Sequence, residues 1–148
     1  KEVMPHAFIG VDVIVGTRGE TDEYFTDAYE YIKGLDFSQL HVFSYSERAG
    51  TLALKIDHCV SPEEKKERSH LLLECSEEKR RRFYKQFIGQ TLPVLFEHSK
   101  SQEMIGGFTP NYIRVEVPYN TDLDNEICLV KLIELNEDQS AIRGEIIY

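Results

Sequence analysis

The sequence has no long hydrophobic run, few cysteines and no zinc-binding pattern of histidines. Its longest run of consecutive apolar residues is Ile127–Val130, far short of the roughly 20 residues that a transmembrane helix needs, so we expect no membrane span. The three cysteines, Cys59, Cys75 and Cys128, are odd in number and widely spaced, which argues against a disulfide framework and a compact cysteine metal site. The five histidines are dispersed, and no two have metal-ligand spacing. This cysteine usage favours a reducing, cytoplasmic setting.

A signal-peptide pattern is also missing, and the sequence begins with Lys1, so we expect a piece of a longer protein. Its 148 residues suffice for one ordinary domain or two small ones with a real core. Hydrophobic residues make up 41% and charged residues 29%, a balance typical of globular chains that excludes disorder.

Positive charge is scarce outside one short segment. The net charge is -9, and residues 89–148 hold 10 Asp and Glu against 4 Lys and Arg, so a simple basic surface for nucleic acid is excluded. The one basic cluster is Lys79–Arg82, inside a predicted helix. Two glutamates, Glu77 and Glu78, precede its last two arginines by four residues, which is the favourable order for ion pairs along a helix. The first interpretation of this cluster is therefore a solvated helical face.

The first 60 residues have the pattern of a strand, a helix and a second strand. Residues 8–16 are apolar and β-branched between glycines, which predicts a strand buried on both faces, as in parallel sheets. Thr21 is a candidate N-cap for a helix that ends at Gly34, and residues 39–44 return to a strand pattern. Together these elements predict a βαβ unit. No further strand–helix pair follows, so the sheet is incomplete in this chain.

A long helix and a run of short strands complete the chain. Ser61-Pro62-Glu63-Glu64 is a strong helix start, with serine as N-cap and glutamate at the capping-box position, and the helical pattern runs to Ile88. Five short strands are then predicted at 91–96, 104–108, 112–117, 126–135 and 141–147, separated by turn signals such as Gly106-Gly107. Such closely spaced strands indicate a small closed or nearly closed barrel of OB-like type.

Two predicted loops follow neighbouring parallel strands at the sheet edge where ligands bind in α/β folds. The first, Gly16-Thr17-Arg18-Gly19-Glu20, lacks the Gly-Lys-Ser/Thr of a P-loop and the glycine spacing of a dinucleotide fingerprint. The second, residues 44–51, has no nucleophile-elbow motif to mark a catalytic serine. A shared ligand pocket and an ordinary structural role both stay open for these loops.

Three ordered motifs resemble one enzyme family. They are Asp12-Val-Ile-Val-Gly-x-x-Gly-Glu-Thr21, His41-Val-Phe-Ser-Tyr-Ser-x-Arg-x-Gly-Thr51 and Phe87-Ile-Gly-Gln-Thr-Leu-x-Val-Leu-Phe-Glu97. With them, essentially the whole chain resembles the carboxyl-terminal part of radical S-adenosylmethionine (radical SAM) methylthiotransferases. Gly107-Phe-Thr-Pro-Asn-Tyr-Ile-Arg-Val115 resembles the small RNA-binding TRAM barrel that ends these enzymes. The asparagine–tyrosine stretch and the Ser-Glu-Arg variant are most similar to the branch that acts on threonylcarbamoyladenosine in tRNA.

The chain departs from this family in two ways. Thr17-Arg18 stands where the family usually has Phe-Pro, so the packing of that turn is expected to differ. The Cys-x-x-x-Cys-x-x-Cys cluster motif and the amino-terminal domain with three further cysteines are missing from the sequence. We therefore expect the chain by itself to hold no metal, to retain no cofactor and to be inactive.

The resemblance implies an α/β plus all-β fold. Residues 1–60 would be a partial (βα) radical SAM barrel segment, residues 61–88 a linker helix, and residues 89–148 a five-stranded, OB-like TRAM barrel. It also implies that the parent enzyme uses S-adenosylmethionine and [4Fe-4S] clusters to insert sulfur and a methyl group into a modified adenosine beside the tRNA anticodon.

The resemblance implies two sets of site residues. Those expected to contact S-adenosylmethionine are Ile14, Gly16, Ser44 and Tyr45, and those expected to contact RNA are Tyr112, Arg114 and Lys131. Tyr112 and Arg114 have the same parity in the predicted strand, which places both side chains on one face. In the alternative interpretation, Tyr112 fills the barrel and Arg114 pairs with Glu116 or another neighbouring acid.

Two other functions stay open at this point. In the first, the chain is a non-catalytic RNA-binding or adaptor module. In the second, it is part of a methylthiotransferase that acts on an aspartate of a ribosomal protein. In each case, the missing flanking strands leave apolar sheet edges such as residues 11–14, and exposed edges of this kind predict self-association.

Overall fold

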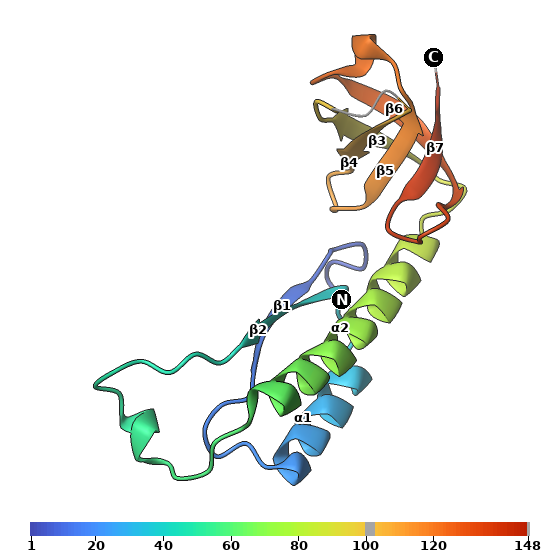
Figure 1. Ribbon diagram of the computed structural model, residues 1–148. Helices are drawn as coiled ribbons and strands as arrows, with labels where there is room; N and C mark the ends of the chain where they lie inside the picture. The colour runs from blue at the N-terminus through green and yellow to red at the C-terminus, as the bar shows by residue number, and fades with distance from the viewer. Residues whose placement is uncertain (100–102, 148) are drawn as a thin grey trace. The chain divides into compact units, whose positions relative to one another are not determined.

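Figure 1 shows the computed structural model of the chain, which describes residues 1–99 and 103–147. The chain forms two compact units, one of residues 9–80 and the other of residues 1–8 together with 81–148. The boundary between the units falls inside the long helix, between Arg80 and Arg81. Within the described ranges, no helix combines the length and hydrophobicity needed to cross a membrane.

The unit of residues 9–80 is a strand–helix–strand motif with a second helix. It contains β1 (Gly10–Val15), α1 (Asp22–Gly34), β2 (Gln39–Ser44), the short 3-10 helix η1 (Leu52–Lys55) and most of α2 (Pro62–Lys85). β1 and β2 pair in parallel, from Gly10 opposite Gln39 to Val15 opposite Ser44. The predicted βαβ unit and the predicted bounds of its second strand are thus confirmed.

Both helices start at the predicted capping residues. The Thr21 hydroxyl accepts a hydrogen bond from the Tyr24 amide at 3.3 Å. At the start of α2, the Ser61 amide donates to the Glu64 carboxylate at 2.8 Å, and the Glu64 amide donates to the Ser61 hydroxyl at 3.2 Å. This reciprocal pair is the capping box that satisfies two amides without helical partners. The hydrogen bonds from Ser61 favour the ionised form and lower the pKa of the Glu64 carboxyl.

The β1–β2 sheet is buried on only one face, so the prediction of burial on both faces is wrong. Val15 and Leu40 pack with residues of both helices, including Phe25 of α1 and Leu72 of α2. The alternate residues of β1 point the other way, and Ile14 is 57% exposed. The physical reason is that α1 and α2 both cover the same face, and no described residues cover the other.

The second unit is a closed five-stranded barrel. Its elements are β3 (Thr91–Phe96), β4 (Met104–Phe108), β5 (Arg114–Pro118), the 3-10 helix η2 (Thr121–Leu123), β6 (Ile127–Leu135) and β7 (Ile142–Ile146). The strand order around the barrel is β3-β4-β5-β7-β6, and β6 pairs back to β3. β5 and β7 run parallel, and the other pairs are antiparallel. This arrangement is compatible with a small OB-like barrel.

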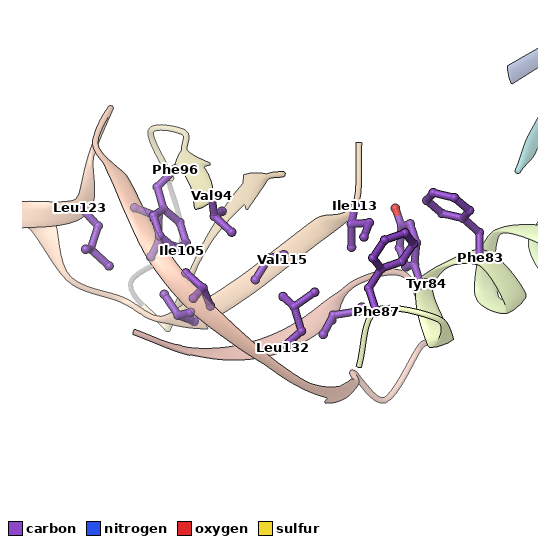
Figure 2. Close-up of a cluster of buried hydrophobic side chains, with 13 residues drawn as sticks. Phe83, Tyr84, Phe87, Val94, Phe96, Ile105, Ile113, Val115, Leu123 and Leu132 are labelled. Carbon is purple, nitrogen blue, oxygen red and sulfur yellow. The ribbon is translucent and has the colours of Figure 1, made fainter. Parts of the chain in front are cut away.

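The barrel core is mostly aliphatic along the strands, with Phe96 of β3 near one end and a group of aromatic residues at the other (Figure 2). Residues at alternate positions, such as Val115 and Val117 of β5, are fully buried, as expected for inward-facing strand positions. Phe83, Tyr84 and Phe87, from the last turn of α2 and just beyond it, close that end. The Tyr84 hydroxyl accepts a hydrogen bond from the Arg114 amide at 3.2 Å. The end of the helix is therefore part of the barrel's core.

Three predicted details differ from the structure. α2 ends at Lys85, because the next amides bond carbonyls three residues back in a turn that leads to Gly89 at a φ of 88°. Gly106-Gly107 lies inside β4 and makes no turn. The third strand starts at Arg114, because Tyr112 has a φ of 62°, which no strand residue adopts.

Candidate functional site

The ends of β1 and β2 bring three of the four expected cofactor residues together. Ser44 lies opposite Val15 in the register, and the Tyr45 amide donates to the Val15 carbonyl at 2.9 Å. Gly16 follows directly, at a φ of 79°. The fourth residue, Ile14, lies opposite Phe43 on the open face of the sheet, where their side chains are 57% and 52% exposed.

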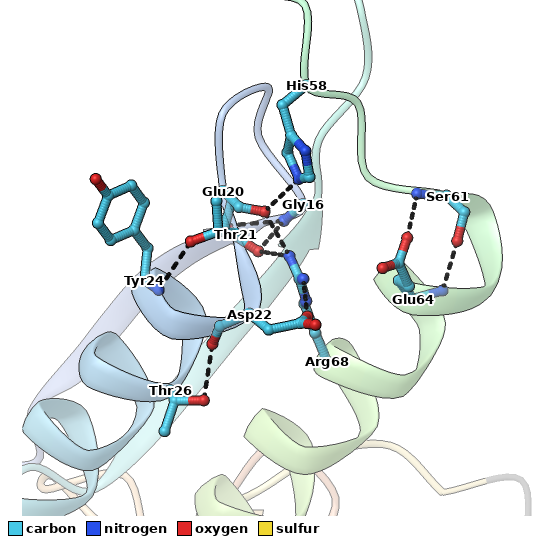
Figure 3. A network of polar contacts seen from close by, with 10 residues as sticks. All are labelled: Gly16, Glu20, Thr21, Asp22, Tyr24, Thr26, His58, Ser61, Glu64 and Arg68. Atoms are coloured by element: carbon cyan, nitrogen blue, oxygen red, sulfur yellow. Dashed lines mark hydrogen bonds and ion pairs between the residues drawn. The ribbon is translucent and has the colours of Figure 1, made fainter.

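An ionic network, largely buried at Arg68 and Glu20 but open to solvent at Asp22, holds the turn that follows β1 (Figure 3). The Gly16 amide donates to both carboxylate oxygens of Glu20, at 3.0 and 3.1 Å. The Arg68 side chain is 5% exposed and donates to Glu20 at 2.7 Å and to Asp22 at 2.6 Å. Removing one partner of a buried ion pair costs about 3–5 kcal/mol. Arg68 of α2 therefore fixes the position of the turn.

Arg18 connects the turn after β1 to the loop after β2. Its guanidinium donates to the Glu47 carboxylate at 2.7 Å and to the Ile56 carbonyl at 2.7 Å. Proline, the residue that the resembling family usually has at the second of the two variant positions, has no side-chain donor. Arg18 therefore links the two loops through hydrogen bonds that a proline side chain could not make.

Helix α2 occupies part of the space beside these loops. A Cβ atom at Gly16 would lie 2.3 Å from Cγ of Lys65, so glycine here accommodates the lysine chain. The Lys65 ammonium donates to the Tyr45 carbonyl at 3.2 Å, and the hydroxyls of Ser44 and Ser69 lie 3.3 Å apart. Among the four expected cofactor residues, Ile14 and Ser44 are exposed, Tyr45 is half-buried and Gly16 is buried.

The open face of the sheet suits a flat, apolar ligand better than a metal. Ile14 and Phe43 offer adjacent exposed apolar side chains, which suit the face of a flat apolar ring. The three cysteines come from different elements: Cys59 is exposed before α2, Cys75 is buried on α2 and Cys128 is half-buried on β6. In residues 1–99 and 103–147, no three His, Cys, Asp or Glu side chains are grouped to hold a metal ion.

In the barrel, Tyr112 projects from a tightly bonded turn. Its ring is 66% exposed and lies 6.0 Å from the ring of Phe8 and 5.7 Å from that of Phe108. A bulky residue at positive φ is strained by about 1–3 kcal/mol. The buried hydroxyl of Thr109 accepts from the Ile113 amide at 3.0 Å, and the Thr109 carbonyl accepts from Tyr112. These bonds hold the strained residue in place.

Arg114 faces a different recess from Tyr112, so the argument from strand parity is wrong. It lines a polar pocket of about 310 Å³ together with Glu97, His98 and Ser99, whereas Tyr112 lines a separate apolar pocket. Glu116 pairs with Arg143 at 3.7 Å, and within the described part of the chain the Arg114 guanidinium has no ion-pair partner. The alternative pairing of Arg114 with Glu116 is therefore not found. Of the neighbouring acids, Asp138 has its pKa lowered mainly by hydrogen bonds from Ser140, with a smaller contribution from the charge of Arg114.

Lys131 stands apart from both pockets. It is exposed on β6, opposite Thr91 of β3 and Glu145 of β7, and it is not among the residues that line either pocket. Two residues of the basic cluster of α2 are also engaged. Lys79 donates to the carbonyls of Lys33 and Leu35 at the end of α1, and Arg80 pairs with Glu77 three residues earlier.

Sequence reasoning missed the residues that arrive from far along the chain. Arg68 is 48 residues from Glu20, and His6 is 105 residues from Asn111, whose side-chain amide donates to the His6 carbonyl at 3.2 Å. Phe8 packs its ring edge against Phe83 at 5.3 Å. No periodicity or spacing in the sequence predicts these contacts.

Comparison with known proteins finds methylthiotransferases over most of the chain. The threonylcarbamoyladenosine tRNA methylthiotransferase MtaB of Bacillus subtilis (strain 168) is 34% identical over 138 residues, which cover 90% of this chain and 31% of that protein. The tRNA-2-methylthio-N(6)-dimethylallyladenosine synthase of Aliarcobacter butzleri is 30% identical over 148 residues, 99% of this chain and 34% of that protein.

A relative named for a ribosomal protein is similar to a comparable degree. The ribosomal protein uS12 methylthiotransferase RimO of Rippkaea orientalis is 31% identical over 145 residues, 91% of this chain and 32% of that protein. The chain thus spans about a third of the length of the curated relatives that it matches. No protein-family model matches the chain.

Proposed function

The chain belongs, by homology over most of its length, to the methylthiotransferases, and from this premise we propose that it is the carboxyl-terminal part of a tRNA-modifying member. The proposed parent enzyme methylthiolates N6-threonylcarbamoyladenosine next to the anticodon. The observation that carries the proposal is 34% identity over 90% of the chain to a protein named for that nucleoside. The three ordered sequence motifs support the same branch.

S-Adenosylmethionine and iron–sulfur clusters, which follow from the family, would supply the radical chemistry that amino-acid side chains lack. The role of this chain would be to position the cofactor. Ile14 and Phe43 offer the adenine ring an apolar surface. The network of Glu20 and Arg68 holds the turn at Gly16 beside that surface. Ser44 and Tyr45 lie at the same sheet edge, where they would contact the cofactor. Because the cluster cysteines are absent, the chain alone is proposed to be inactive.

The barrel is proposed to bind the tRNA. Tyr112 offers an exposed ring on which a base can stack. Arg114, free of ion-pair partners among the described residues, suits a phosphate, and Lys131 adds a second exposed cation. Because the barrel segment is acidic, these few placed groups carry the recognition instead of a broad positive field.

The test of the substrate is the nucleoside content of tRNA from cells that lack the gene for this protein. Mass spectrometry of digested total tRNA is expected to show loss of 2-methylthio-N6-threonylcarbamoyladenosine and accumulation of its unthiolated precursor. Re-expression of the wild-type gene restores the product. If tRNA from the deletion strain keeps the methylthio group, the tRNA proposal is refuted.

A second candidate function is methylthiolation of a ribosomal protein, favoured by the 31% identity to the uS12 enzyme over 91% of this chain. The same deletion strain decides between the two. Peptide mass analysis of uS12 would then show a missing methylthio group, while tRNA nucleosides stay unchanged. A non-catalytic adaptor predicts that neither product changes.

A further inference from the structure

The barrel unit carries a pocket of about 640 Å³, which lies within the usual range of about 300–1,000 Å³ for small-molecule sites. Its walls come from residues 4–8, from Gln90 to Pro93 at the start of β3, and from the turn of Pro110 to Tyr112. No Asp, Glu, Lys or Arg lines it. The pocket therefore suits an uncharged ligand, although the segment that forms the barrel is strongly acidic.

Aromatic rings from two distant parts of the sequence meet at this pocket. Phe8 lies 6.0 Å from Tyr112, and His6 packs edge-on against Phe87 at 5.5 Å between ring centroids. Most of the Tyr112 ring is open to solvent. Flat, partly exposed rings around an uncharged recess favour a flat ligand that stacks.

The pocket is preformed, since its two sides are tied together. The Asn111 side chain donates to the His6 carbonyl at 3.2 Å and accepts from the Thr109 hydroxyl at 2.7 Å. Thr109 in turn holds the backbone of the turn through Tyr112 and Ile113. The Tyr112 ring is thus positioned before any ligand arrives, which lowers the entropy cost of binding.

Two side chains that line the pocket, Gln90 and His6, have polar atoms available to hydrogen-bond a ligand. The side-chain Nε2 of Gln90 donates to the Gln86 carbonyl at 3.1 Å, and the side-chain oxygen of Gln90 has no partner among the described residues. The ring nitrogens of His6 likewise bond no group in that part of the chain. An acceptor oxygen and an imidazole ring edge beside aromatic faces match the hydrogen-bonding edge of a nucleobase.

We propose that this pocket receives one unpaired nucleobase of the RNA, stacked on Tyr112 and Phe8. The inference rests on the proposed function, because it assumes that the parent enzyme binds tRNA. It assigns His6, Phe8 and Gln90 to RNA recognition, although the sequence pattern marks none of them. It also accounts for RNA binding by an acidic barrel, because a stacked base needs no positive charge in its pocket.

Fluorescence of 2-aminopurine placed at successive loop positions of an anticodon stem-loop RNA tests the proposal in the full-length protein. One position is expected to be quenched on binding through stacking on Tyr112. Tyr112→Leu is expected to abolish this quenching and raise the Kd about 5- to 150-fold, the equivalent of about 1–3 kcal/mol for one stacked base. Tyr112→Phe keeps the ring and is expected to retain both signals.

The matched control is Tyr24→Leu, because Tyr24 of α1 is a similarly exposed tyrosine, at 63% against 66%. It is expected to leave the Kd unchanged. Phe8→Leu changes the opposite wall of the pocket. It tests whether RNA binding depends on the whole pocket or only on the turn that carries Tyr112. Circular dichroism melting checks that each variant is folded. The dependence of the Kd on salt should be the same for Tyr112→Leu and the wild type, since no phosphate contact is lost.

The binding experiment distinguishes a wrong pocket proposal from a wrong proposed function. If the wild type binds the RNA, but Tyr112→Leu and Phe8→Leu bind it equally well with quenching retained, the pocket proposal is overturned and tRNA binding stands. If the wild type does not bind the RNA at all, the proposed tRNA substrate fails first, and this inference falls with it.

Discussion

Replacing Gly107 by alanine should damage the barrel far more than the same change at the adjacent Gly106. Gly107 of β4 lies opposite Phe96 of β3, and a Cβ atom there would be 2.3 Å from the Leu95 carbonyl oxygen and 2.8 Å from Cα of Phe96. Both are backbone atoms, so no side-chain rotation relieves the clash. At Gly106 the nearest atom is the Val115 carbonyl oxygen at 3.7 Å, an ordinary contact.

The two variants make the same substitution at neighbouring positions of one strand, Gly107 being buried and Gly106 half-buried. Each removes glycine's extra freedom in the unfolded chain, which stabilises the fold by about 0.4–1 kcal/mol. The shared backbone contribution cancels in the difference between them, which therefore reports mainly the clash at the buried position. Overpacking costs about 1–3 kcal/mol, and we expect the upper end because the strands themselves must separate. Gly107→Ala should thus lower the free energy of unfolding by about 3 kcal/mol relative to Gly106→Ala.

Amide hydrogen exchange is the suitable assay, because it reports the barrel separately from the other unit. The most protected amides of β3 and β6 give the free energy of opening in each variant. A difference of less than about 1 kcal/mol between Gly107→Ala and Gly106→Ala would refute the close approach of β3 to β4. Comparable loss in both would show instead that a side chain is harmful at either glycine of β4.

Three further predictions concern the helix start, the thiols and the sheet edge. Ser61→Ala should destabilise the start of α2 by about 0.5–2 kcal/mol, seen as faster amide exchange in its first turn. The pKa of Glu64 is lowered in the folded chain. The ionised carboxylate therefore stabilises the helix start above the ordinary pKa of the group, and this stabilisation is lost as pH falls through the lowered pKa. This loss should be absent in Glu64→Gln when exchange is followed across acidic pH. Cys59 should react with a thiol reagent in the folded chain, whereas Cys75 should react only on unfolding, since it is buried and burial raises the pKa of its thiol. The unpaired edge of the β1–β2 sheet should cause self-association of the isolated chain, and sedimentation showing only monomer at millimolar concentration would contradict this.

The local elements of this protein are readable from its sequence because short-range chemistry sets them. The bounds of β2, β3 and β4 follow from apolar and β-branched runs, and those three strands occur as predicted. The helix starts at Thr21 and Ser61 follow from capping preferences. The family, too, is evident from the order of three motifs, because each motif is contiguous in the chain.

Only the tertiary structure decided which residues share a site. Tyr112 and Arg114 are two positions apart, yet the positive φ of Tyr112 breaks the strand alternation and places them in different pockets. Residues 1–8 belong to the barrel unit, although the barrel strands begin only at Thr91. Arg68 reaches Glu20 across 48 residues. Burial, ion pairing and ring contacts of this kind depend on which distant segments meet, and neither periodicity nor motif spacing carries that information.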